Sequence, residues 1–228
     1  LLWLGRWARR VSGGGPRAMH ARYQPAAALV ALAALAALWG LRAWAAVPVE
    51  RLRYVSVGAL QRPALGLSVL ANPGDTWWAV GRSFAVVATL TTALVVWSQS
   101  RPRPAPARLL GALPLAVLAS LSNAAVEEVI FRLGPGQALH DVVAPDALAL
   151  LSGLLFGLPH YFGSPGGVPG VVMAGFLGWL MCQSMLQTGG LAWALVLHGL
   201  QDVVIFTILF AQGGRRGDGG AAPEANLI

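Results

Sequence analysis

Residues 191–211 read LAWALVLHGLQDVVIFTILFA, an apolar run in which only His198 and Asp202 are ionisable. As an α-helix, 21 residues at the usual rise would extend about 31 Å, which matches the hydrocarbon thickness of a bilayer. Ionisable side chains are costly inside lipid, so their presence in such a run marks a candidate site. The run therefore predicts a transmembrane helix that carries functional groups.

The rest of the chain has the same character. Of its 228 residues, 56% are apolar and 11% are charged, and the mean hydropathy is +0.63. A soluble globular domain has roughly 25% charged residues, so this class is excluded. We predict an all-α fold, a polytopic membrane helical bundle of about six transmembrane helices. The expected spans are 27–47, 77–98, 109–132, 147–162, 169–187 and 191–211.

Composition divides the chain into four segments. Residues 1–26 form a basic tail that we expect to be disordered and cytoplasmic, and residues 212–228 form a disordered C-terminal tail. Residues 27–108 hold the N-terminal transmembrane helices and loops, and residues 109–211 form the membrane core with the candidate site. Because Met19 lies just before the first span, the residues before it are either an expressed tail or an upstream extension of the gene model.

The basic residues are all arginines, 16 in number, and the net charge is +7. Nucleic-acid binding would fit this charge, but arginines that flank transmembrane helices explain it more simply. We expect a multi-pass protein of a bacterial cell membrane that contacts the lipid bilayer and does not bind nucleic acid. The single cysteine, Cys182, excludes an intramolecular disulfide and a cysteine-cluster metal site, and we interpret it as a packing residue.

The first polar cluster in the core is Glu127, Glu128 and Arg132. On a helix, Glu128 and Arg132 are four residues apart on one face, in the favourable acid-first order. We expect these two to form an ion pair, which leaves Glu127 available as a general base. The alternative is that all three form a structural charge network.

The second polar position is His160, which follows Pro159 in the predicted span 147–162. A lone histidine in a helix is more often a packed, hydrogen-bonded residue than a functional one. Proline weakens the helix nearby, because it lacks an amide donor and clashes with the preceding turn. The resulting kink would favour a functional role for His160.

His198 and Asp202 form the third cluster, again four residues apart on one helical face. They could form a local hydrogen bond, or His198 could be a ligand or an oxyanion donor that Asp202 orients. Together the three clusters contain carboxylates and imidazoles but no obvious protein nucleophile. A water activated by Glu127 and His160, with or without a metal, is the most economical nucleophile.

These motifs resemble those of the CPBP family, also called the Abi or CAAX protease family, of intramembrane endopeptidases. The family signature is Glu-Glu-x-x-x-Arg, then Phe-x-x-x-His, then His-x-x-x-Asn or Asp, each on a membrane helix. The chain matches it, in order and spacing, at Glu127, Glu128, Arg132, Phe156, His160, His198 and Asp202.

The resemblance implies cleavage of a peptide bond in a membrane-associated peptide or protein. Glu127 and His160 would activate water, and His198 with Asp202 would support the oxyanion. The motifs do not distinguish a glutamate-type mechanism from a metal-assisted one. In the metal-assisted case, Glu127, His160 and His198 are the candidate ligands of a divalent metal such as zinc.

The chain departs from the family pattern at two positions. Leu133 stands where glycine commonly follows the arginine, which affects local packing, and Asp202 stands where asparagine is common. In addition, straight helices would place Glu127 and His160 at different membrane depths. We therefore expect a tilted helix, a break near Pro159 or a re-entrant segment, unless the predicted boundaries or orientation are wrong.

Two other functions fit the same polar groups less well. The first is a non-catalytic membrane immunity or scaffold protein that keeps these residues as a structural network. The second is a transporter in which the Glu, His and Asp side chains relay protons.

Overall fold

The structure is a computed structural model that describes residues 53–67, 72, 74–139 and 142–213. The predicted tail 1–26, the predicted span 27–47 and residues 214–228 lie outside the described residues. Every regular element in the described ranges is a helix, which confirms the all-α fold class. The elements are α3 (Trp77–Gln99), α4 (Pro106–Glu128), η2 (Val129–Leu133), α5 (Gly134–Leu139), α6 (Pro145–Gly157), η3 (Leu158–Phe162), α7 (Gly167–Thr188) and α8 (Ala192–Gly213).

Four helical segments of the described chain are long and apolar enough to cross a membrane. They are α3, the continuous run from α4 through η2 to α5, α7, and residues Ala192–Gln212 of α8. The predicted span 147–162 is helical but is not among these four, because α6 ends at Gly157 and continues as the 3₁₀ helix η3. The predicted count of six transmembrane helices is therefore not confirmed.

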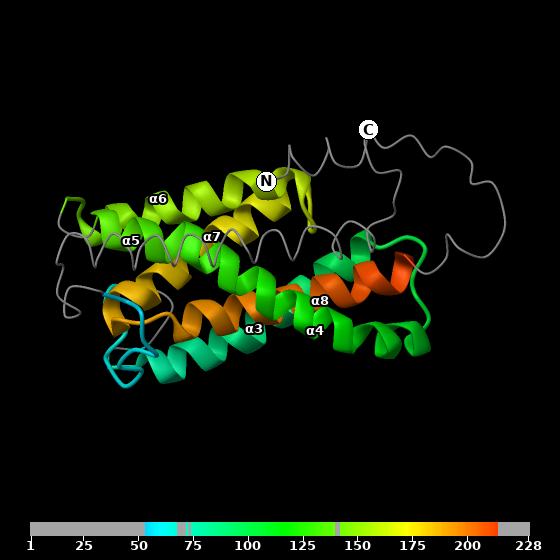
Figure 1. Ribbon diagram of the computed structural model, residues 1–228, viewed down its shortest axis with the longest axis horizontal. Helices are drawn as coiled ribbons and strands as arrows, with labels where there is room; N and C mark the ends of the chain where they lie inside the picture. The colour runs from blue at the N-terminus through cyan, green and yellow to red at the C-terminus, as the bar shows by residue number, and fades with distance from the viewer. Residues whose placement is uncertain (1–52, 68–71, 73, 140–141, 214–228) are drawn as a thin grey trace, which may run out of the picture.

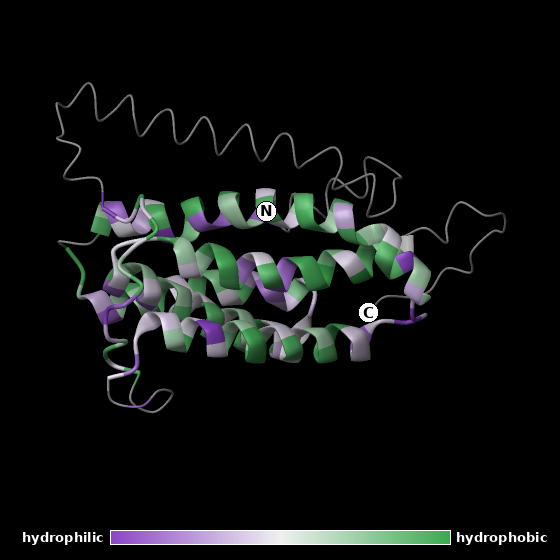
Figure 2. Cartoon of the chain, turned by 90° about the horizontal axis from the view of Figure 1, so that it is seen from below, coloured by the Kyte–Doolittle hydropathy of each residue, from purple (hydrophilic) through white to green (hydrophobic). Residues whose placement is uncertain are grey.

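The outer surface of the helices is apolar, as lipid contact requires. Along α3, Val86, Leu90 and Leu94 are spaced by four residues and are 60%, 65% and 69% exposed. The helices in Figure 2 accordingly show long hydrophobic stretches. A patch of this kind is disfavoured in water but matches the hydrocarbon of a bilayer. The described helices thus have the surface of an integral membrane protein.

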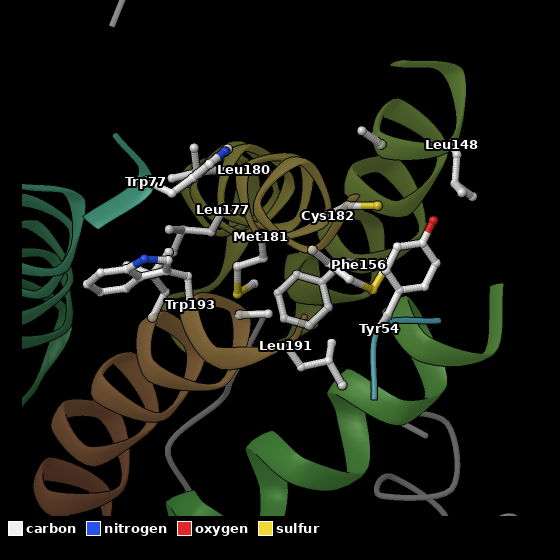
Figure 3. Packing of buried hydrophobic residues seen from close by; sticks show 14 of the residues in the cluster. Tyr54, Trp77, Leu148, Phe156, Leu177, Leu180, Met181, Cys182, Leu191 and Trp193 are labelled. Carbon is white, nitrogen blue, oxygen red and sulfur yellow. The ribbon is translucent and has the colours of Figure 1, made fainter. Parts of the chain in front are cut away.

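The helices form two packed groups, as Figure 1 shows. α8 packs against both α3 and α4, and α6 packs against α7. The main core joins the two groups. Figure 3 shows Phe156 of α6 near Met181 of α7 and Leu191, with Trp77 and Trp193 at the opposite side of the core. Cys182 is buried in this core, as its apolar setting in the sequence indicated.

Glycines allow α6 and α7 to approach closely. A Cβ atom on Gly157 would lie 2.7 Å from the Cα atom of Gly175, and one on Gly153 would lie 2.8 Å from the Gly175 carbonyl oxygen. Any larger side chain at these positions would force the helices apart. The close packing fixes the position of α6, which carries Phe156 on its buried side.

The loop 53–67 covers the turn between α7 and α8. The Ala59 amide donates to the Thr188 carbonyl at 2.8 Å, and the Leu191 amide donates to the Ser56 carbonyl at 2.9 Å. Gly189 ends α7 in the left-handed conformation, with a φ of 77°. The loop therefore ties the N-terminal part of the described chain to the start of α8.

Candidate active site

The motif around Glu127 lies where the helical geometry changes. Glu127 and Glu128 end α4, and Arg132 lies in the π-helical turn η2. The Gly134 amide donates to the Val129 carbonyl, which is the i to i+5 pattern of a π turn. Such turns leave carbonyl groups without their usual partners and are frequent at functional sites. Here the Ser152 hydroxyl of α6 donates to the Phe131 carbonyl at 3.1 Å.

The predicted ion pair between Glu128 and Arg132 is present. Arg132 NH1 donates to Glu128 Oε1 at 2.9 Å, and both side chains are fully buried. The same carboxylate oxygen accepts a second hydrogen bond from His198 Nδ1 of α8 at 2.7 Å. Glu128 therefore joins α4 to α8, and a carboxylate engaged in this way is poorly placed to act as a base.

Arg132 also stacks on the aromatic ring of Phe156. Its guanidinium carbon lies 4.0 Å from the ring centroid, a close cation–π contact. Among the described residues, Arg132 Nε and NH2 have no hydrogen-bond partner, so the ring packs against a guanidinium that is hydrogen-bonded through NH1 alone. Phe156 in turn contacts His198 edge-on, with 5.3 Å between ring centroids, and His160 at 4.8 Å. One aromatic ring thereby contacts Arg132 and both histidines.

Three carboxyl groups surround His198. In addition to the bond with Glu128, His198 Nε2 lies 3.6 Å from Glu127 Oε2 and 3.6 Å from Asp202 Oδ2. A distance of 3.6 Å is too long for a hydrogen bond, so His198 and Asp202 share a face without forming the local bond considered from the sequence. Of the three acids, Glu127 has the most accessible side chain, with 22% exposed against 0% for Glu128 and 10% for Asp202.

His160 lies in η3, directly after the point where α6 stops being α-helical. Of the alternatives considered from the sequence, a break near Pro159 is therefore present, as a change from α-helical to 3₁₀ geometry. His160 Nδ1 lies 2.7 Å from the Phe156 carbonyl oxygen. Since a carbonyl can only accept, Nδ1 must carry the proton, and in the neutral imidazole the lone pair is on Nε2. The local backbone thus prepares His160 to accept a proton or a hydrogen bond at Nε2.

A small cavity of about 40 Å³ connects the second and third motifs. His160, His198 and Asp202 line it, together with Phe156 and with Gln201 beside Asp202. A single water needs roughly 10–15 Å³, so the cavity can hold water against several polar groups. The second and third motifs, far apart along the chain, therefore meet at one water-sized space, and His198 joins that space to Glu127 and Glu128 of the first motif.

Sequence reasoning missed two side chains at this site. Asn123 Nδ2 donates to Asp202 Oδ2 at 3.0 Å and so fixes the carboxylate from α4. Gln201 lines the cavity and is 5% exposed. Asn123 could have been found, because it is a polar residue one helical turn before Glu127 in an apolar run. Nothing in the sequence distinguishes Gln201 from other amides.

The metal site considered for Glu127, His160 and His198 gets no support from the geometry. Within the described ranges, no three His, Cys, Asp or Glu side chains are grouped closely enough to hold a metal ion. We therefore derive no step that runs through a metal.

Comparison with known proteins agrees with the motifs. Residues 109–204 match the family model described as Type II CAAX prenyl endopeptidase Rce1-like. Over this segment the chain is similar to the CAAX protease family. No curated protein and no solved structure matches the chain.

The matched segment begins within α4 and ends within α8, so it includes all three motifs. α3 and the loop 53–67 lie before it, although Thr92 of α3 lines the cavity. α3 therefore contributes one residue, Thr92, to the lining of the cavity between the second and third motifs.

Proposed function

We propose that the chain is an intramembrane endopeptidase in which Glu127 and His160 activate a water molecule for attack on a peptide carbonyl. The observation that carries the proposal is the difference among the carboxyl groups around His198. Glu128 is held by Arg132 and His198, and Asp202 is held by Asn123. Glu127 is the most exposed of the three and is thus the best placed to exchange a proton.

The reaction begins with a water in the cavity that His160, His198 and Asp202 line. Glu127 takes one proton from this water while the water oxygen bonds to the carbonyl carbon, and His160 Nε2 accepts a hydrogen bond from the water. The negative charge then lies on the former carbonyl oxygen. His198, in its protonated form, can donate from Nε2 to this oxyanion, with Asp202 and Glu128 fixing the position of the imidazole.

The tetrahedral intermediate then breaks down. Glu127 returns the proton to the nitrogen of the leaving group, and the carbon–nitrogen bond breaks to give an acid and an amine. The substrate class that we propose is a membrane-associated peptide or protein. The family description adds a specific candidate, a peptide with a prenylated cysteine near its C-terminus.

A test uses the full-length protein in lipid nanodiscs with two fluorogenic probes, a farnesylated CAAX-type peptide and the same peptide without the lipid. We expect cleavage by the wild type and a loss of at least about 100-fold in kcat for Glu127→Gln and for His160→Ala. Asp146→Asn serves as a matched control, because Asp146 lies at the start of α6 and bonds Gln183 rather than the motif residues. Full activity of Glu127→Gln would overturn the assignment of the base.

Cleavage of the farnesylated probe alone would support the prenylated substrate. Cleavage of both probes would support hydrolysis of membrane peptides without a requirement for the lipid. The non-catalytic alternative replaces the protease proposal if neither the wild type nor any variant cleaves a probe. In that case the variants should also match the wild type in thermal stability and in binding of the peptides.

A further inference from the structure

Gln201 presents a buried acceptor that no described residue satisfies. The side chain is 5% exposed, and its Oε1 atom has no hydrogen-bond partner in the part of the chain that the structure describes. Buried polar atoms are almost always paired, since leaving one unpaired costs stability. The residue lies beside Asp202 and lines the same cavity as His160 and His198.

The orientation of the Gln201 amide is fixed by its nitrogen. Nε2 donates to the Leu197 carbonyl at 3.1 Å and to the Thr89 hydroxyl of α3 at 3.3 Å. Exchanging the oxygen and nitrogen atoms would place two acceptors against each other at Leu197, so the assignment is determined by its partners. With both N–H groups engaged, Oε1 is the only part of the amide left for another donor.

The size of the cavity suits a water as this donor. At about 40 Å³ it exceeds the space that one water needs. A buried water requires two to four polar partners. Gln201 and His160 both line this cavity, and Gln201 Oε1 and His160 Nε2 are the atoms of these two side chains that can accept a hydrogen bond from a water.

We propose that Gln201 orients the attacking water. On this account, which rests on the proposed hydrolytic function, Glu127 takes one proton of the water, and the other O–H is shared between Gln201 Oε1 and His160 Nε2 as a three-centre hydrogen bond. Holding one O–H leaves the other for the base and directs an oxygen lone pair toward the carbonyl carbon. Gln201 itself exchanges no proton. Thr89 acts through Gln201, as a positioning residue from a helix outside the family segment.

The test compares steady-state kinetics of full-length variants in nanodiscs with the farnesylated CAAX-type peptide. Gln201→Met keeps the length of the side chain and removes the acceptor, and Thr89→Val removes only the hydroxyl that holds the amide. We expect Gln201→Met to lower kcat by about 10- to 100-fold with KM unchanged within twofold, and Thr89→Val to lower kcat by a smaller factor.

The matched controls are Gln212→Met and Thr91→Val, which we expect to behave as wild type. Gln212 bonds the Pro102 carbonyl at the far end of α8, and Thr91 is exposed on α3 and bonds its own helix. An unchanged kcat for Gln201→Met would overturn the proposal. An increase in KM with kcat unchanged would also overturn it, because Gln201 would then be a substrate contact.

A second measurement does not depend on activity. We expect a high-resolution structure of the wild type to show an ordered water at about 2.7–3.2 Å from both Gln201 Oε1 and His160 Nε2. A protein donor on Oε1, or a cavity without ordered water, would overturn the proposal. If Glu127→Gln still cleaves the peptide, the proposed mechanism fails. The high-resolution structure then decides by itself whether Gln201 binds a water. If Gln201→Met fails to fold, Thr89→Val and the structure decide it.

Discussion

Glu128 on α4 and His198 on α8 are 70 residues apart in sequence and share a hydrogen bond of 2.7 Å between Oε1 and Nδ1. The same oxygen receives Arg132, so a single carboxylate connects the first and third motifs. Charged partners without access to water depend strongly on one another. This bond is the reason that we propose different roles for the two adjacent glutamates of the motif.

Replacing Glu128 by Ala should destabilise the protein. The substitution leaves the guanidinium of Arg132 buried without its ionic partner, and breaking a buried pair in this way costs about 3–5 kcal/mol. Thermal unfolding of purified protein in nanodiscs should show a clearly lower midpoint. Glu127→Gln is the matched control, since Glu127 is partly exposed and we expect its midpoint to stay close to that of wild type. An equal decrease in the unfolding midpoint for the two variants would contradict a structural role for Glu128 that Glu127 does not share.

Adding a methyl group at Gly178 should disturb the Arg132 site. A Cβ atom there would lie 3.0 Å from Phe156 Cβ and 3.2 Å from Arg132 NH2. Overpacking of this kind costs typically about 1–3 kcal/mol, so Gly178→Ala should lower both the unfolding midpoint and kcat. Gly111→Ala on α4 meets nothing within 4 Å and should be neutral or slightly stabilising. A wild-type unfolding midpoint and kcat for Gly178→Ala would contradict this prediction, because the site would then accommodate the extra methyl group beside Arg132.

Arg132→Lys should not be a conservative change. Lysine keeps the positive charge but lacks the planar group that stacks on Phe156 at 4.0 Å and reaches Glu128. We expect a loss of about 10-fold or more in kcat at matched protein levels, because Phe156 also contacts both histidines. The check is peptide cleavage by both proteins under one condition. Full activity with lysine would mean that charge alone suffices at this position.

Asn123→Leu should impair the reaction without unfolding the helix. It removes the donor that holds Asp202 Oδ2 at 3.0 Å and leaves a similar volume. If Asp202 must stay in place beside His198, kcat should decrease by about 10-fold, as for other lost orienting contacts. Leu121→Ala, at a lipid-facing position two residues earlier, is the control. Equal kinetics for the two variants would remove Asn123 from the site.

The sequence predicted those features that depend on local spacing. The i to i+4 pairing of Glu128 with Arg132 and the break near Pro159 are both present. α3, α7 and α8 also lie close to the predicted spans. The span 147–162 differed because hydropathy alone does not register the change to 3₁₀ geometry after Gly157.

The features that were not predicted depend on tertiary contacts. The Asn123 bond to Asp202 joins residues 79 apart, and the Gln201 bond to Thr89 joins residues 112 apart. The position of α6, close against α7, depends on glycines whose partners lie on another helix. The spacing of residues along one sequence does not indicate which polar side chains contact one another across helices. Residues of the site could therefore be predicted, but their contacts could not.

The most direct test of the central claim compares peptide termini in membranes from cells that express the wild type or Glu127→Gln at matched levels. The account predicts new termini in the wild-type membranes that are absent with Glu127→Gln, because the two proteins differ only in the carboxyl group that takes the proton from water. Identical sets of new termini in the two membranes would contradict the role of Glu127 and with it the proposed mechanism.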